Sequence, residues 1–236
     1  MAAKSEPQSR RKARAKADRV SGAEAWIFDL DNTLYPARCN LFAEIDRRMG
    51  EYIAKLLNLD YDSAKRVQKQ FFREHGTTMR GLMREHGIDP RGFLEYVHDI
   101  DLSPVAPDAG LDAALARLKG RKLVFTNGSV PHAERVLARL GVAQHFEAIY
   151  DIVAADFVPK PEPGPYRRFC ERYALDPAAC VMVEDIARNL KPAYDLGMTT
   201  VWVPGVAEWS LGESDLAHVH HVAEDLSAWL GRIAGA

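Results

Sequence analysis

Two aspartates, Asp29 and Asp31, lie two positions apart at the end of the apolar run Ala25–Phe28. A short apolar run of this kind predicts a buried strand, and alternate residues of an extended chain point to the same side. Buried carboxylates repel each other unless a cation pairs them, and Mg²⁺ prefers oxygen ligands. The pair therefore indicates a magnesium site at a strand end. Taken alone, it would instead be interpreted as two solvated loop residues.

Polar residues also follow two further predicted strands. They are Glu184 and Asp185 after the run 180–183, and Thr126, Asn127 and Gly128 after the run 122–125. A second acidic strand end would complete the cation site, whereas a hydroxyl, an amide and a glycine-freed backbone suit phosphate oxygens. Lys160, between two prolines, is either a rigidly held partner for a phosphate or a surface lysine in a proline-rich turn.

The elements that must position these residues alternate between strands and helices after Pro104. We expect strands at 122–125, 148–152, 180–183, 199–203 and 220–222, with helices between them. Together with the first strand, this alternation predicts a Rossmann-like, three-layer α/β/α core with a mostly parallel sheet. Such sheets bind ligands beyond the carboxyl ends of their strands, which is where the polar clusters lie.

Residues 40–98 show apolar positions at helical spacing and no strong strand signal, which predicts an all-helical insertion. We therefore expect a core domain formed by 23–34 and 105–236, and a helical cap domain at 35–104. Residues 1–22 are rich in Lys and Arg, and we expect them to form a disordered basic tail. Such a tail could instead touch nucleic acid or act as a transit peptide.

The composition is that of a soluble globular protein, with 47% hydrophobic and 27% charged residues among 236. No apolar run approaches the roughly 20 residues of a membrane span, so we expect no membrane partner. The formal net charge of −2 does not favour a nucleic-acid partner. Three scattered cysteines indicate reduced thiols and a cytoplasmic location. The sequence leaves the oligomeric state open.

In combination, the motifs resemble the haloacid dehalogenase superfamily of phosphatases over residues from about 24 to 205. The resemblance rests on the order Asp-x-Asp-x-Thr, strand-Thr-Asn, Lys-Pro and strand-Glu-Asp-x-x-x-Asn. The helical stretch after Asp31 resembles that superfamily's C1-type cap. Residues 28–36, 75–82, 96–99, 124–128 and 132–137 are similar to its pyrimidine 5'-nucleotidase branch, whose members commonly remove phosphate from UMP or CMP.

The resemblance implies a Mg²⁺-dependent phosphomonoester hydrolase that acts through an aspartyl-phosphate. The implied substrate is a pyrimidine nucleoside 5'-monophosphate or a similar small phosphorylated metabolite. In this scheme Asp29 is the nucleophile, Asp31 the general acid and base, and Lys160 the partner of the phosphate charge. The implied metal ligands are the Asp29 carboxylate, the Asp31 backbone carbonyl and Asp185.

Further residues are expected around this centre. Thr126, Asn127 and Gly128 would bind the phosphate, and Glu184, Asn189 and Thr33 would support the acidic groups. Four cap-side residues are candidates for substrate contact, unless they pack the cap or hold its hinge: Thr77, Thr78, Arg80 and His98. The sequence departs from the family pattern at His75, where a tyrosine is frequent, and at Glu184, where an aspartate is frequent.

Several alternative functions share these motifs. A sugar-phosphate phosphatase or phosphomutase shares nearly all of them, and a catalytically weak binding or regulatory protein could retain the fold. A haloacid dehalogenase is disfavoured because it does not need Asp31 as an acid and base. A phosphonatase would need a cap lysine that forms a Schiff base, and the sequence offers no clear candidate.

Overall fold

The computed structural model describes Val20, residues 22–205 and residues 216–235. The expected basic tail therefore lies outside the described residues except at its end, where Val20 is buried in the core. Within the described part of the chain, Cys39, Cys170 and Cys180 form no disulfide. None of the helices described there combines the length and the apolar character that crossing a membrane requires.

Six parallel strands form one sheet in the order β3-β2-β1-β4-β5-β6. Their bounds are β1 Ala25–Phe28, β2 Arg121–Phe125, β3 Ala148–Tyr150, β4 Cys180–Glu184, β5 Thr199–Trp202 and β6 His221–Val222. The first strand of the chain is thus central, and its last residue, Phe28, lies beside Val124 of β2 and Val183 of β4. Because the strands are parallel, their carboxyl ends share one edge of the sheet.

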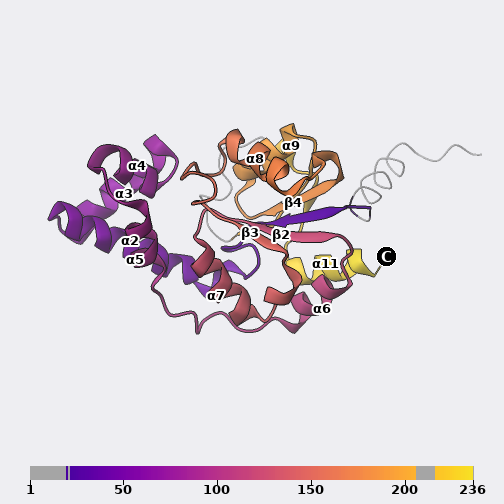
Figure 1. Ribbon diagram of the computed structural model, residues 1–236. Coiled ribbons are helices and arrows are strands. Elements are labelled where there is room, and N and C mark those ends of the chain that lie inside the picture. Colours follow the sequence, from indigo (N-terminus) through magenta and orange to yellow (C-terminus); the bar gives the residue numbers. More distant parts are fainter. Residues whose placement is uncertain (1–19, 21, 206–215, 236) are drawn as a thin grey trace, which may run out of the picture.

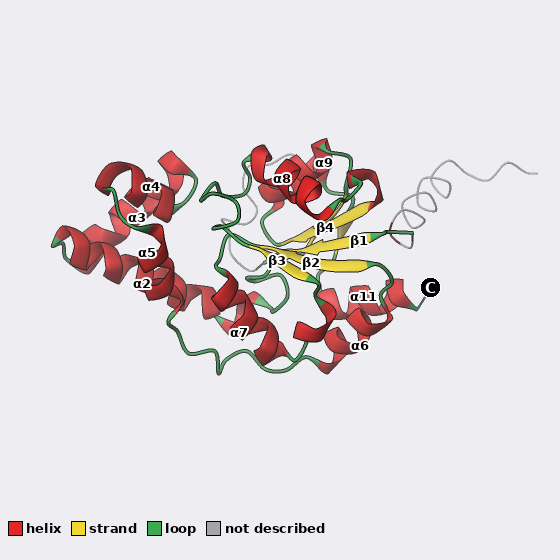
Figure 2. Ribbon diagram, in the orientation of Figure 1, coloured by secondary structure: helices red, strands yellow, loops and turns green. Residues whose placement is uncertain are grey.

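Helices cover both faces of this sheet (Figure 2). On one face lie α8 Pro163–Tyr173 and α9 Ala187–Asp195, and on the other lie α6 Ala109–Arg117, α7 Val130–Leu140 and α11 Leu226–Ala234. The apolar side chains of β1 alternate between the two faces. Ile27 packs in the cluster beneath α8 and α9, whereas Trp26 and Phe28 pack in the cluster beneath α6, α7 and α11. The predicted three-layer, Rossmann-like core is confirmed.

The segment between β1 and β2 is helical, as predicted. It contains α2 Leu41–Leu57, α3 Tyr61–His75, α4 Thr78–His86 and α5 Pro90–His98, which gather at one end of the molecule away from the sheet (Figure 1). Asp60, Thr77 and Asp89 begin the last three of these helices by accepting a hydrogen bond from a first-turn backbone N–H. We retain residues 35–104 as the proposed cap.

Short 3₁₀ helices complete the described elements: η1 Ala37–Cys39, η2 Ala143–His145, η3 Pro177–Ala179 and η4 Leu216–His218. Three strands are shorter than predicted: β3 ends at Tyr150 and not at residue 152, β5 ends at Trp202, and β6 begins at His221. The Asp151 carboxylate accepts hydrogen bonds from Val130 N–H at 3.0 Å and Ala154 N–H at 2.8 Å. Asp151 therefore ends the strand by joining the turn that follows it to the start of α7.

Candidate active site

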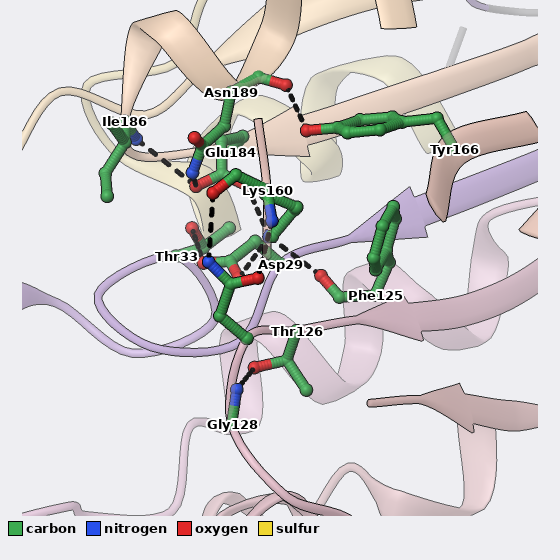
Figure 3. Close-up of polar contacts among 11 residues, drawn as sticks. Asp29, Thr33, Phe125, Thr126, Gly128, Lys160, Tyr166, Glu184, Ile186 and Asn189 are labelled. Carbon is green, nitrogen blue, oxygen red and sulfur yellow. Dashed lines mark hydrogen bonds and ion pairs between the residues drawn. The ribbon is translucent and has the colours of Figure 1, made fainter. Parts of the chain in front are cut away.

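Five polar residues meet at the carboxyl edge of the sheet, and Figure 3 shows Asp29, Thr126, Lys160 and Glu184 among them. Asp29 follows β1, Thr126 follows β2, Glu184 ends β4, Asp185 follows it, and Lys160 lies in the loop before α8. The Asp29 N–H donates to the Val183 carbonyl at 2.9 Å, so the backbone of Asp29 remains attached to the neighbouring strand. The sequence separated these residues by as much as 156 positions, and the strand order brings them to one place.

Lys160 is the only cation at the centre of this group among the described residues. Its Nζ donates to Asp29 Oδ1 at 2.7 Å, Glu184 Oε2 at 2.6 Å and the Phe125 carbonyl at 2.9 Å. An ammonium has three N–H groups, so all of its hydrogen-bonding capacity is used. Burial alone would lower the pKa of Lys160, but the charges of Asp29 and Glu184 raise it above its usual value. Lys160 therefore stays charged and holds the two carboxylates.

Two asparagines brace this arrangement. The Asn127 Oδ1 accepts the Lys160 N–H at 2.8 Å, so this side chain positions the lysine loop. The Asn189 Nδ2 donates to Glu184 Oε1 at 3.0 Å, and the Asn189 carbonyl accepts the Tyr166 hydroxyl at 2.6 Å. Both oxygens of the Glu184 carboxylate are thereby engaged, one by Lys160 and one by Asn189.

Three buried carboxylates share this one ammonium. Ligand oxygens of Asp29, Glu184 and Asp185 all lie within 4.8 Å of one another. Burial and the Glu184 charge raise the pKa of Asp29 to about 7, against the opposing effect of Lys160, and burial with the same Glu184 charge raises that of Asp185. Two negative charges are left without compensation, and a divalent cation with oxygen ligands matches both this charge and this donor set. The residues therefore fit Mg²⁺.

The carboxylate of Asp31 is not part of that cluster. The strand ends at Phe28, and the chain then turns, with the Leu34 N–H donating to the Leu30 carbonyl at 3.0 Å and Asn32 at φ 60°. Strand alternation therefore does not extend to Asp31. Its backbone carbonyl remains the predicted metal ligand, whereas its side chain has partners of its own.

Those partners are Tyr35 and His132, which the sequence analysis did not identify as site residues. The Tyr35 hydroxyl donates to Asp31 Oδ1 at 2.7 Å, and His132 Nε2 lies 2.8 Å from the same oxygen. Burial raises the pKa of Asp31, but His132 and the hydrogen bond from Tyr35 together hold it at about 2. His132 lies among the apolar residues of α7, so its helical spacing alone indicates a core position.

Gly128 keeps open the space between the expected phosphate ligands. Its N–H donates to Thr126 Oγ1 at 2.9 Å. A Cβ at Gly128 would lie 3.2 Å from Thr126 Oγ1 and 3.6 Å from Asp31 Oδ2. The Thr33 hydroxyl donates to Asp29 Oδ2 at 3.0 Å, whereas Lys160 contacts the other oxygen of the same carboxylate. The Thr126 hydroxyl, the Gly128 backbone and Oδ2 of Asp31 thus converge beside Asp29.

The four candidate cap-side residues have different surroundings. Thr77 begins α4, where its hydroxyl accepts the Arg80 N–H at 3.1 Å, and Thr78 is buried. His98 is buried at the end of α5, where its Nδ1 lies 3.0 Å from Ser129 Oγ. Arg80 donates to Glu162 Oε1 at 2.8 Å, which joins the cap to the core. The contact of these residues with a substrate remains a prediction.

A pocket of about 520 Å³ lies between the cap and the core. The cap contributes His75, Arg80 and Arg84, and the core contributes Lys160 and Arg188, among other residues. Of the four candidates, Arg80 is thus the one that faces this pocket. The unusual His75 also lines it, so the departure from the family pattern falls on a surface open to a ligand.

Known proteins resemble this chain in sequence and fold. A family model described as haloacid dehalogenase-like hydrolase matches residues 23–197. Phosphate metabolism protein 8 of Saccharomyces cerevisiae is 29% identical over 197 residues, which are 74% of this chain and 60% of the yeast protein. The chain thus covers less than two thirds of that relative. The glyceraldehyde 3-phosphate phosphatase of Methanocaldococcus jannaschii is 28% identical over 194 residues, 74% of this chain and 82% of that protein.

Among solved structures, CbbY from Rhodobacter sphaeroides in complex with xylulose-(1,5)bisphosphate is similar with a TM-score of 0.60. It is 22% identical, and the match covers 85% of this chain and 93% of that chain. At this identity the likeness concerns the fold. The family model, in contrast, matches well over half of the sequence and spans every strand end described above except β5 and β6. The chain therefore belongs to the haloacid dehalogenase-like hydrolases.

Proposed function

We propose that this protein is a Mg²⁺-dependent phosphatase that hydrolyses phosphate monoesters through an aspartyl-phosphate on Asp29. The observation that carries the proposal is the setting of the Asp29 carboxylate. One of its oxygens contacts Lys160 Nζ at 2.7 Å, the other contacts the Thr33 hydroxyl at 3.0 Å, and two further buried carboxylates lie beside it. A carboxylate held in this way can attack phosphorus when the charge of the phosphate is neutralised nearby.

The residues divide the reaction into two transfers of the phosphoryl group. An oxygen of Asp29 forms a bond to phosphorus while the ester oxygen leaves and takes a proton from Asp31. Water then attacks phosphorus and gives a proton to Asp31, and Asp29 is released. Mg²⁺, held by Asp29, Asp185 and the Asp31 carbonyl, would neutralise phosphate charge. The negative charge of a bound phosphate near Asp31 raises its proton affinity, as the first transfer requires.

For the substrate, we propose a small phosphorylated metabolite, with pyrimidine nucleoside 5'-monophosphates as the favoured class. The similarity of residues 28–36 and 124–128 to the pyrimidine 5'-nucleotidase branch supports this choice. The pocket of about 520 Å³ is within the size range of small-molecule sites, and its arginines suit an anionic ligand. The phosphatase named among the relatives acts, by its name, on glyceraldehyde 3-phosphate, so triose and other sugar phosphates belong in the same test.

The test is release of inorganic phosphate from UMP, CMP and a set of sugar phosphates by purified protein with Mg²⁺. We expect turnover with at least one of them and a loss of at least about 1,000-fold in Asp29→Asn, with an unchanged circular dichroism spectrum. Asp195→Asn is the matched control, because Asp195 is an exposed residue of α9 that pairs with Lys191. It should retain full activity.

Three outcomes would contradict the proposal. Retained activity in Asp29→Asn would exclude Asp29 as the nucleophile. If the whole panel releases no phosphate, the protein is a binding or regulatory member of its family. Movement of phosphate between sugar positions without net release would instead assign it as a phosphomutase.

A further inference from the structure

Asp31 is held through only one of its two carboxylate oxygens. Among the described residues, the hydrogen bonds to its side chain come from Tyr35 and His132, and both end on Oδ1 at 2.7 Å and 2.8 Å. The other oxygen, Oδ2, lies on the side of Gly128, 3.6 Å from where a Cβ there would stand, and the Asp31 side chain is 17% exposed. The two oxygens of this one carboxylate thus have different surroundings, one occupied by donors and one directed to the expected phosphate site.

The two donors are themselves fixed in place. Tyr35 is 1% exposed and His132 is 1% exposed, so neither side chain can turn away into solvent. The ring of His132 stacks on that of His98, with centroids 4.3 Å apart and planes 10° apart, and His98 contacts Ser129 through Nδ1. Such packing restricts the rotation of the imidazole ring and thereby aims its Nε2 at Asp31.

The surroundings of His132 also assign its tautomer. A carboxylate oxygen only accepts, so Nε2 must carry the hydrogen that it shares with Asp31. Its Nδ1 is buried and has no hydrogen-bond partner among the described residues. His132 is therefore a donor to Asp31 through Nε2.

We propose that Tyr35 and His132 are positioning residues that fix Oδ1 of Asp31, so that Oδ2 is the oxygen that exchanges protons during catalysis. Two donors on Oδ1 use its lone pairs and leave Oδ2 as the site of protonation. This inference rests on the proposed function, since it takes Asp31 as the acid and base. It adds two residues to the machinery and gives His98 a role as the support of His132.

Asp31 gives up one proton in the first half of the reaction and takes one up in the second. In the first, the bond between phosphorus and the ester oxygen breaks as the bond to Asp29 forms, and the proton on Oδ2 passes to the leaving oxygen. In the second, the bond from a water oxygen to phosphorus forms as the bond to Asp29 breaks, and a proton of that water passes to Oδ2. The carboxylate returns to its starting state, and Oδ1 keeps its two hydrogen bonds throughout.

The test compares two substrates that differ in their need for an acid. The p-nitrophenolate that leaves p-nitrophenyl phosphate is stable without a proton, whereas the alkoxide that leaves glycerol phosphate is not. The quantity kcat/KM reports the first transfer for both. We expect Tyr35→Phe to lower kcat/KM for glycerol phosphate by about 10-fold, a part of the 10²–10⁴ that acid catalysis supplies, and to change p-nitrophenyl phosphate less than about 3-fold.

Variants at His132 provide a rescue arm. His132→Leu, which has no donor, should show the same selective loss, and His132→Gln, whose amide N–H can reach Oδ1, should recover part of it. Tyr150→Phe is the matched control. It removes a buried phenolic hydroxyl that has no hydrogen-bond partner among the described residues, from the opposite face of the sheet to Trp26 and Phe28. It should leave the ratio of the two substrates unchanged.

Asp31→Asn separates this proposal from the proposed function. A large selective loss in Asp31→Asn together with an equal fall on both substrates in Tyr35→Phe would overturn the positioning role and leave Asp31 as the acid. If Asp31→Asn itself retains both activities, the assignment of Asp31 fails, and the positioning role fails with it. A selective loss in Asp31→Asn, Tyr35→Phe and His132→Leu alike supports the proposal.

Discussion

His98 lies where the chain leaves the helical segment, and its ring is almost fully enclosed. It is 8% exposed, with Ser129 on one side and the ring of His132 against its face. Burial, helped by the neighbouring His132, lowers the pKa of His98 from 6.5 to about 3. The imidazole is therefore neutral in the folded protein at a pH where the unfolded chain takes up a proton.

This shift predicts how stability depends on pH. Between pH 6.5 and about 3, the unfolded state binds a proton at His98 that the folded state does not, so this contribution to stability is present above pH 6.5 and is lost as the pH falls. His98→Gln should remove it. We expect the free energy of unfolding in urea to fall less steeply from pH 7 to pH 5 in the variant, by at most about 1.4 kcal/mol per pH unit. Parallel curves would show that His98 is protonated in the folded protein.

Residues with a strong sequence signal and residues without one meet in the same site. Asp29 and Asp185 could be predicted because each directly follows an apolar strand, and Lys160 because two prolines flank it. Tyr35 and His132 could not, because each lies among apolar neighbours and only the fold brings them to Asp31. The phosphate-binding role of Asn127 stays a prediction, and its side chain also holds the Lys160 loop, a contact between segments that no local pattern encodes.

At the scale of elements, the close contact between α3 and α4 depends on a glycine. Gly81 of α4 lies against Phe71 of α3, and a Cβ at Gly81 would fall 2.4 Å from the Phe71 Cβ. Gly92 of α5 is also helical, but a Cβ there would meet nothing within 4 Å. The same substitution should therefore have opposite effects at the two positions.

Gly81→Ala should destabilise the protein by about 1–3 kcal/mol, because the methyl group must displace a packed aromatic side chain. Gly92→Ala should stabilise it by about 0.5–1 kcal/mol, because alanine loses less backbone entropy than glycine in a helix. Urea unfolding followed by circular dichroism measures both. Equal shifts of the same sign would show that α3 and α4 do not pack as closely as described.

Most elements follow from local patterns. Asp60 lies at the start of α3 and Pro90 at the start of α5, and a capping carboxylate and a first-turn proline act within a few residues of sequence. The strand order could not be derived in the same way, since it depends on which strands pair across long connections. The end of β3 was missed because Asp151 bonds to a segment more than 20 residues earlier.

At the scale of the whole molecule, the acidic cluster links metal binding to stability. Asp29, Glu184 and Asp185 are buried together with only Lys160 to offset them among the described residues, so their repulsion opposes folding. We expect Mg²⁺ at 100 times its dissociation constant to raise the free energy of unfolding by about 2.7 kcal/mol. The melting temperature should rise by about 5–10 °C.

Asp185→Asn provides the control for this prediction. It removes one buried negative charge, so the metal-free variant should melt at or above the temperature of the metal-free wild type, and Mg²⁺ should shift it little. Sodium chloride at matched ionic strength should not reproduce the shift in the wild type. The highest concentration worth testing is about 10 mM Mg²⁺. If the melting temperature of the wild type does not change there, the result contradicts a cation site at this cluster.

The central place of β1 in the sheet has a consequence during synthesis of the chain on the ribosome. Of the six strands, β1 emerges first from the ribosome. Its partners on both sides, β2 and β4, are made only much later. At about 5–20 residues per second, Ala25–Phe28 waits on the order of ten seconds before β4 exists. Until then Trp26, Ile27 and Phe28 lack the complete sheet that buries them, so the nascent segment before Asp29 exposes apolar side chains that a chaperone can bind.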